Sequence, residues 1–154
     1  MKYKDDRQWA DSYLPVVAAI LKSNAMHLVN ITVAPPEQDA TEATDMVVTV
    51  TGGTVAVRIR RDECRWRDLT LRSWRASGHT TELAKVKAGF AKWYLYAWTT
   101  QGRITEWVLV DMDVARATVL QREWPQRTNP DGRTKFIAIS REELRRAGCL
   151  VAAQ

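Results

Sequence analysis

Cysteine and histidine are scarce in this sequence, with two of each among 154 residues. Cys64 and Cys149 lie in unrelated contexts without the paired spacing of a zinc site, and His27 and His79 are too isolated to form a metal-ligand pair. A zinc centre is therefore not expected. The cysteine usage also makes a reducing compartment, the cytoplasm, the default location.

Long apolar runs are missing as well. The only early one, Leu14 to Leu21, contains Pro15 and is far too short to cross a bilayer, so we expect neither a signal peptide nor a membrane partner. The sequence also lacks a Gly-rich phosphate loop and a G-x-S-x-G elbow. These absences exclude the nucleotide-binding and serine-hydrolase sites that such motifs build.

What the sequence does have is an ordinary globular composition with a basic excess. Apolar residues make up 45% and charged residues 27%, and the length suits a single domain covering residues 1–154. The net charge of +5, with a pI near 9.5, favours nucleic acid or another acidic partner.

Local patterns predict a mixed α/β (α+β) fold. Pro15 predicts a kink, or a division into two short helices, within the first helical pattern. Thr80 is the expected N-cap of a second helix, and Ser140 with Glu143 has the pattern of a capping box before the last. The expected helices cover 7–21, 81–92, 114–122 and 141–147. Besides a hairpin, the expected strands cover 28–33, 69–74 (the third strand of a meander with the hairpin), 93–100, 104–112 and 135–140.

The hairpin is predicted by the stretch ATDMVVTVTGGTVAVRIRR, which would turn at Gly52-Gly53. That turn would place Asp45 opposite Arg60. Because side chains alternate along a strand, one face is apolar, and Asp45, Arg58 and Arg60 converge on the other. One interpretation of this convergence is an exposed cross-strand ion pair, which would contribute less than about 1 kcal/mol.

A second interpretation comes from the stretches ATDMVV, VAVRIRR, LTLRS, SGHTTELAKV and WYLYAW. They resemble a group of small phage-encoded proteins placed near the PD-(D/E)xK nuclease superfamily. Over roughly residues 11–111, the order of the expected elements is also similar to the core of that superfamily. That order is a helix, three meandering strands, a second helix and a further strand, with an acid entering the hairpin between the second and third strands. The resemblance implies a restriction-endonuclease-like core with extra C-terminal strands and helices, located in the host cytoplasm if the protein is phage-encoded.

The resemblance also assigns roles to acids, with one departure from the family pattern. Asp45 matches the family's Asp, but Arg58-Ile59-Arg60 stands where the pattern has Glu-x-Lys, and a guanidinium cannot ligate a metal. Members of the superfamily move the second acid and the lysine onto the following helix, where this chain has Glu82 and Lys85.

The implied site therefore holds Mg²⁺ or Mn²⁺ between Asp45 and Glu82, with Lys85 at the phosphate and Asp11 as an additional metal-binding acid. Other interpretations stay open. Glu82 also suits the helix dipole and an ordinary surface pair with Lys85, and Asp11 also suits an exposed helix position or a cap.

Basic and aromatic residues complete the candidate site. Arg58, Arg60 and Arg72 could hold a phosphate backbone, and Trp66, in a polar turn, is the aromatic residue expected to be exposed for stacking on a base. A solvated strand edge is the alternative for the arginines. The first expectation is a metal-dependent nuclease, acting on DNA more than RNA. A nuclease-like nucleic-acid-binding protein without catalysis, and a phage protein that inhibits a host system, are the alternatives, and a homodimer is left open.

Overall fold

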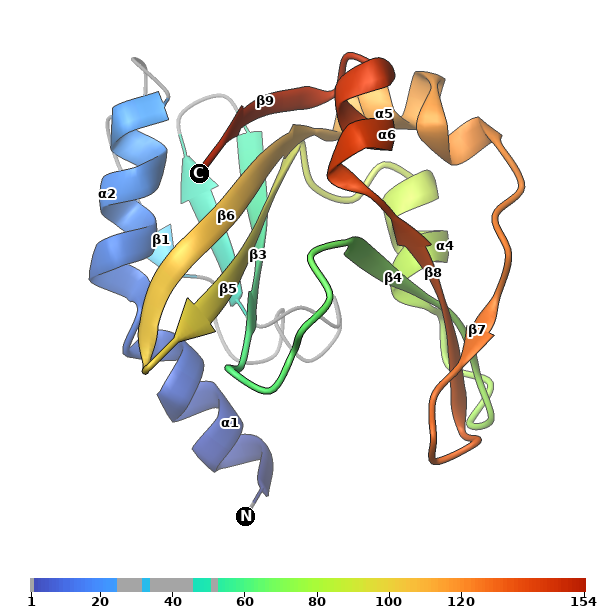
Figure 1. Cartoon of the computed structure of the whole chain (residues 1–154), viewed down its shortest axis with the longest axis horizontal. Coiled ribbons are helices and arrows are strands. Elements are labelled where there is room, and N and C mark those ends of the chain that lie inside the picture. Colours follow the sequence, from blue (N-terminus) through green and yellow to red (C-terminus); the bar gives the residue numbers. More distant parts are fainter. Residues whose placement is uncertain (1, 25–31, 34–45, 51–52) are drawn as a thin grey trace.

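Two β-sheets form the framework of the protein, seen in the computed structural model that describes residues 2–24, 32–33, 46–50 and 53–154. Within these residues the larger sheet has the order β1-β2-β3-β5-β6-β9 and the smaller sheet the order β4-β8-β7 (Figure 1). The larger sheet comprises β1 (Thr32–Val33), β2 (Met46–Val50), β3 (Gly53–Arg60), β5 (Trp93–Thr100), β6 (Arg103–Asp111) and β9 (Leu150–Ala153). The smaller comprises β4 (Leu69–Arg75), β7 (Arg127–Thr128) and β8 (Thr134–Ile139).

Helices accompany both sheets, so the predicted mixed α/β class is confirmed. They are α1 (Lys2–Asp11), α2 (Leu14–Asn24), α4 (Glu82–Lys87), α5 (Met112–Ala117), the 3₁₀ helix η1 (Val119–Gln121) and α6 (Arg141–Arg146). The predicted division of the first helix near Pro15 is also confirmed. Pro15 lies in the first turn of α2, where its missing N–H leaves no hydrogen bond unmade.

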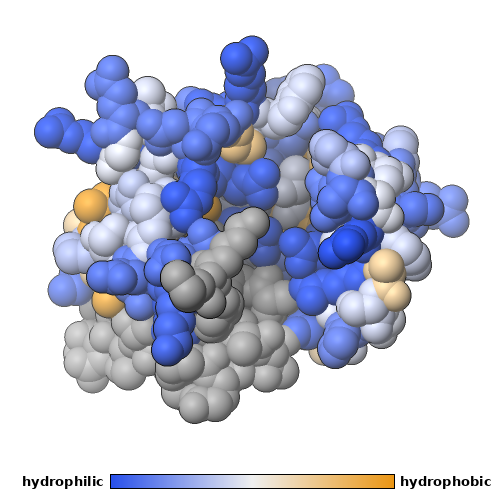
Figure 2. Space-filling view, turned by 90° about the horizontal axis from the view of Figure 1, so that it is seen from below, coloured by the Kyte–Doolittle hydropathy of each residue, from blue (hydrophilic) through white to orange (hydrophobic). Residues whose placement is uncertain are grey.

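The surface seen from below is largely hydrophilic (Figure 2). No helix among the described residues is long and apolar enough to cross a membrane.

The larger sheet begins as an antiparallel run and then changes direction. β1, β2 and β3 pair antiparallel in chain order, and β5 then pairs parallel to β3. The helix α4 lies between β3 and β5 in the chain. Of predicted strand 28–33, only residues 32–33 lie within the described residues.

Strand 69–74 is present as β4, but its predicted role as the third meander strand is wrong. β4 pairs with β8 of the smaller sheet, Leu69 opposite Ile139 and Leu71 opposite Ile137. The free edge of β3 is taken by β5, whose residues 94–99 are all buried. A strand that is buried on both faces needs pairing along both edges, and β3 and β6 supply it.

The hairpin register also differs from the prediction. Val50 pairs with Gly53, so Gly53 belongs to the strand and the predicted Gly52-Gly53 turn is wrong. A Cβ on Gly53 would meet the side chains of Lys92 and Trp93 at 3.1 Å, so a larger residue there would have to push these neighbours aside by a few tenths of an ångström. The shift is two residues, so each residue keeps its predicted face. Asp45, and with it the predicted Asp45–Arg60 pair, lies outside the described residues.

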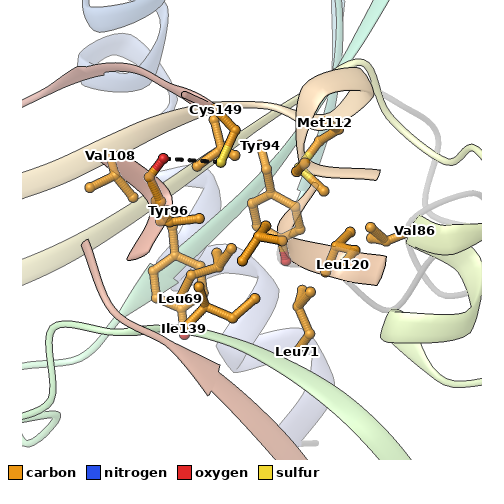
Figure 3. Packing of buried hydrophobic residues seen from close by; sticks show 14 of the residues in the cluster. Leu69, Leu71, Val86, Tyr94, Tyr96, Val108, Met112, Leu120, Ile139 and Cys149 are labelled. Atoms are coloured by element: carbon orange, nitrogen blue, oxygen red, sulfur yellow. Dashed lines mark hydrogen bonds between the residues drawn. The ribbon is translucent and has the colours of Figure 1, made fainter. Parts of the chain in front are cut away.

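Apolar side chains cover both faces of the larger sheet. On one face Val55, Val57 and Ile59 pack with residues of α1 and α2, including Val17 and Leu21. On the other face the alternate residues of β5 and β6 pack against the smaller sheet. Figure 3 shows this second core, where Tyr94 and Tyr96 extend from β5 among Leu69, Leu71 and Ile139. The face that carries Arg58 and Arg60 is therefore turned toward the smaller sheet, not toward open solvent.

Helix ends follow local chemistry with some differences from the prediction. Thr81, not Thr80, caps α4, and the helix ends at Lys87 because Gly89 and Ala91 adopt positive φ values of 109° and 59°. Ser140 caps α6 as predicted, accepting from the Glu143 amide at 3.1 Å. The Glu143 carboxylate, however, pairs with Arg122 at 2.6 Å. Strands β7 and β9 were not predicted.

Candidate functional site

A cavity of about 390 Å³ lies between the two sheets. We call it the intersheet cavity. Its walls come from β3 and β5 of the larger sheet, from β4, β7 and β8 of the smaller sheet, from the turn between β3 and β4, and from the first residue of α4. The lining residues are Arg58, Arg60, Cys64, Trp66, Asp68, Thr70, Arg72, Glu82, Tyr96, Arg127, Thr128, Asn129, Pro130, Phe136 and Ala138.

Arginines reach this cavity from both sheets. Arg58 and Arg60 alternate with buried Ile59 on β3, while Arg72 comes from β4 and Arg127 from β7. The three arginines predicted from the sequence are thus brought together, although β4 belongs to another sheet. Arg127 was missed because residues 125–133 were predicted as a loop with no strand to orient it.

Glu82 lies at the cavity wall and its carboxylate is already engaged. It is 1% exposed, although it is the first residue of a helix. The Tyr94 hydroxyl donates to Oε1, the Arg72 amide donates to Oε2 at 3.2 Å, and Nη2 of Arg58 lies 3.3 Å from Oε1. Burial, followed by the charge of Glu82, raises the pKa of Tyr94, so its hydroxyl keeps its proton and remains a donor.

The other guanidinium groups of the cavity lack a carboxylate partner among the described residues. Arg60 donates from Nε to Sγ of Cys64 at 3.4 Å, and neither Arg72 nor Arg127 forms an ion pair with a described residue. Asp68 is the second acid of the described wall, and it too forms no ion pair with another described residue. Burial, then the charges of Arg75 and Arg58, lowers the pKa of Arg72, against a smaller attraction from the charges of Glu82 and Asp131. The cavity thus concentrates positive charge where water screens it poorly.

Trp66 stands at the mouth of the intersheet cavity. It is 70% exposed, so the sequence-based expectation of an exposed indole is confirmed. It also borders a neighbouring hollow of about 840 Å³, which shares Arg58, Arg60 and Cys64 with the intersheet cavity. Arg61 of that hollow pairs with Asp6 at 2.7 Å and lies over the Trp9 ring at 4.1 Å. Its charge is therefore already compensated within the protein.

Of the remaining predicted site residues, the two that the structure describes, Lys85 and Asp11, do not line the cavity. Asp45 lies outside the described residues. Lys85 is half-buried on α4 and is not part of the described cavity wall. Asp11 ends α1 and accepts from Nε of Arg7 at 3.5 Å. Over the described ranges, no three His, Cys, Asp or Glu side chains lie together as a metal-binding group.

Comparison with known proteins finds no family model that matches the chain and no match among curated proteins.

Proposed function

We propose that this protein binds nucleic acid, with the arginines of the intersheet cavity holding phosphate groups. The observation that carries the proposal is the presence of Arg60, Arg72 and Arg127 around one cavity without carboxylate partners among the described residues. Arg60 and Arg72 are half-buried, and guanidinium groups held in such a space without a paired carboxylate raise the free energy of the folded protein. An anion with several oxygens removes that cost, because each guanidinium can donate two parallel hydrogen bonds to it.

The exposed indole favours nucleic acid over a simple anion. Trp66 borders the same cavity and presents its ring to solvent. Every base has a π face, and stacking on an exposed aromatic side chain contributes roughly 1–3 kcal/mol per base. Phosphate contacts from arginines and stacking on an aromatic ring are the two parts of non-specific single-strand recognition.

The strand order supports the proposed likeness to the PD-(D/E)xK superfamily. With β4 set aside, helices α1 and α2, the antiparallel run β1-β2-β3, helix α4 and strand β5 stand in the order that the resemblance implies. On this proposal the smaller sheet is an addition, since β4 enters the chain between β3 and α4. The additional sheet forms the second wall of the intersheet cavity.

A metal-dependent nuclease is the second candidate function. The observation in its favour is that Glu82, the acid proposed to have moved onto the helix, lies at the same cavity as the arginines. The fit of Mg²⁺ or Mn²⁺ to the described residues is poor, because both Glu82 oxygens accept from protein donors and a metal would have to displace Arg58. Binding without catalysis is therefore the better-supported proposal.

Fluorescence anisotropy with labelled single-stranded and duplex DNA and RNA over a series of salt concentrations tests binding. Wild-type affinity should fall steeply with salt, with a slope near −0.7 per phosphate contact for single strands. Arg60→Gln and Arg72→Gln should each weaken binding about tenfold and reduce the slope. Arg145→Gln removes an equal charge from exposed α6 and serves as the control. Equal effects of all three variants, in folded protein, would refute a role for the cavity.

The nuclease candidate is tested with the same probes after adding Mg²⁺ or Mn²⁺. Cleavage that disappears in Asp45→Ala would establish it. Cleavage that survives Asp45→Ala, or no cleavage of any probe, would overturn it, whatever the binding measurements show.

A further inference from the structure

The intersheet cavity is small for a site that binds nucleic acid. Its 390 Å³ lies near the lower end of the range of roughly 300–1,000 Å³ for small-molecule pockets. Sheets close it on two sides, β3 and β5 on one and β4 and β8 on the other. A space of this size suits a small-molecule ligand, such as a single nucleotide, and not a length of strand. A duplex keeps its bases stacked inside a wide rod, so only a strand end or an unstacked nucleotide can enter.

We propose that the intersheet cavity binds a terminal phosphate monoester of single-stranded nucleic acid. This inference rests on the proposed function and names the part of the strand that the cavity takes. The ligand chemistry is a phosphate with three free oxygens, carried by either end of a strand.

The charge of the cavity matches that ligand. Among the described residues that line the cavity, Arg58 is offset by Glu82, while Arg60, Arg72 and Arg127 contribute three positive charges and Asp68 one negative charge, leaving two positive. Asp131 does not line the cavity, but its charge also attracts Arg72. A phosphate monoester carries about −1.5 to −2 at neutral pH, because its second pKa is near 6. An internal phosphodiester carries a single negative charge and would leave the cavity positive.

The donors stand in different walls, as a ligand with three oxygens requires. Arg60 enters from β3 of the larger sheet, and Arg72 and Arg127 from two strands of the smaller one. Phe136 and the exposed Trp66 both line the cavity. The first base behind a bound phosphate would therefore meet an aromatic ring.

The crowding of positive charges around Arg72 also favours a doubly charged ligand. Arg72 lies close enough to Arg75 and Arg58 for their charges to lower its pKa, in addition to burial. A doubly charged phosphate among these groups would reverse that repulsion, and a neutral or singly charged ligand would do so less.

The test uses one labelled single-stranded sequence in four forms: with a 5′-phosphate, with a 3′-phosphate, with neither, and as a closed circle. We expect one of the two phosphorylated forms to bind at least about tenfold more tightly than the form without end phosphates. The two arms identify which end is bound. Inorganic phosphate should compete with the phosphorylated strand for the cavity.

Two variants test whether the preference for a phosphorylated end comes from the intersheet cavity. Arg127 is exposed, so Arg127→Gln leaves the packing intact, and Arg72→Gln removes a half-buried donor. Both should bring the affinity ratio between phosphorylated and unphosphorylated forms close to one. Arg145→Gln should leave the ratio unchanged.

Other outcomes separate this inference from the proposed function. If all four forms bind equally and Arg127→Gln weakens them equally, end recognition is refuted and nucleic-acid binding stands. If no form binds, both fail. A preference for one end that survives Arg72→Gln and Arg127→Gln would place end recognition elsewhere and overturn this proposal.

Discussion

Replacing Glu82 by glutamine separates two roles for this residue, a buried ion-pair partner and a metal ligand. Glutamine keeps the shape of the side chain and removes its charge. Its amide group would also bring N–H donors toward the Arg72 amide and the Arg58 guanidinium, where the carboxylate now only accepts. We expect Glu82→Gln to destabilise the folded protein strongly.

The expected size follows from the geometry. Glu82 is 1% exposed and lies 3.3 Å from Nη2 of Arg58. At that distance, with an effective dielectric constant near 20, the attraction between the charges is about 5 kcal/mol. Breaking a buried pair by removing one partner costs about 3–5 kcal/mol, which agrees with this value. For a chain of this length the loss corresponds to a fall in Tm of roughly 6–20 °C.

Urea unfolding followed by tryptophan fluorescence measures this change, with equal m-values showing that the unfolding transition remains comparable. The control is Glu142→Gln, whose exposed carboxylate pairs with Arg145 and Arg146, each at 3.0 Å. It should change the free energy of unfolding by less than about 1 kcal/mol. Arg58→Met combined with Glu82→Gln should destabilise less than the two changes added.

A Glu82→Gln variant that is as stable as the wild type, or more stable, would refute the structural role of Glu82. Carboxylates held for a metal often cost stability, and their removal then leaves the protein unchanged or more stable. If Glu82→Gln is neutral or stabilising in the absence of metal, the ion pair with Arg58 does not support the fold.

Three further changes test other parts of the structure. Hydrogen bonding by Arg67, ahead of other effects, holds the pKa of Glu106 below its ordinary value of 4.5. The stabilisation that ionised Glu106 gives the folded protein is therefore present above that pH and lost as the pH falls below it. Glu106→Gln should flatten the acid side of a Tm–pH profile, and an unchanged profile would contradict the pairing. Leu71→Ala should cost about 2–5 kcal/mol in urea unfolding because Leu71 is fully buried between the sheets, and a loss below 1 kcal/mol would contradict that packing. Ser140→Ala should cost about 1 kcal/mol through loss of the α6 cap, with Ser140→Asp retaining stability in the same assay.

Elements whose signals are local were predictable from the sequence. The run WYLYAWTT gave strand β5 with its bounds correct, because aromatic and β-branched residues favour a strand regardless of its partners. Ser140 gave the start of α6 because its hydroxyl bonds within the same turn. The division of the first helix followed from the backbone of Pro15 alone.

Features that depend on distant partners were not predictable. Gly53 lies in β3 and packs closely against Lys92 and Trp93, about forty residues later in the chain. The local sequence does not show that contact, so the prediction placed both glycines in the turn. Strand 69–75 has an alternating pattern that fits either sheet, and only the burial of β5 decides where it pairs. The sequence therefore predicted Arg58, Arg60 and Arg72 as candidate site residues. It predicted neither Arg127 nor the smaller sheet, which forms the second wall of the intersheet cavity.

The departure of β4 from the larger sheet changes what the arginines mean. On an open face, Arg58 and Arg60 would be screened by water and their pairing would contribute little. Facing the smaller sheet, they occupy a half-buried space together with Arg72, and charge there must be balanced. Glu82 balances Arg58, which explains why an acid at the start of a short helix is buried at 1% exposure. No described acid forms an ion pair with Arg60 or Arg72, although the charges of Glu82 and Asp131 attract Arg72. On the function proposed above, a bound anion would supply the ion pairs that Arg60 and Arg72 do not form with described residues.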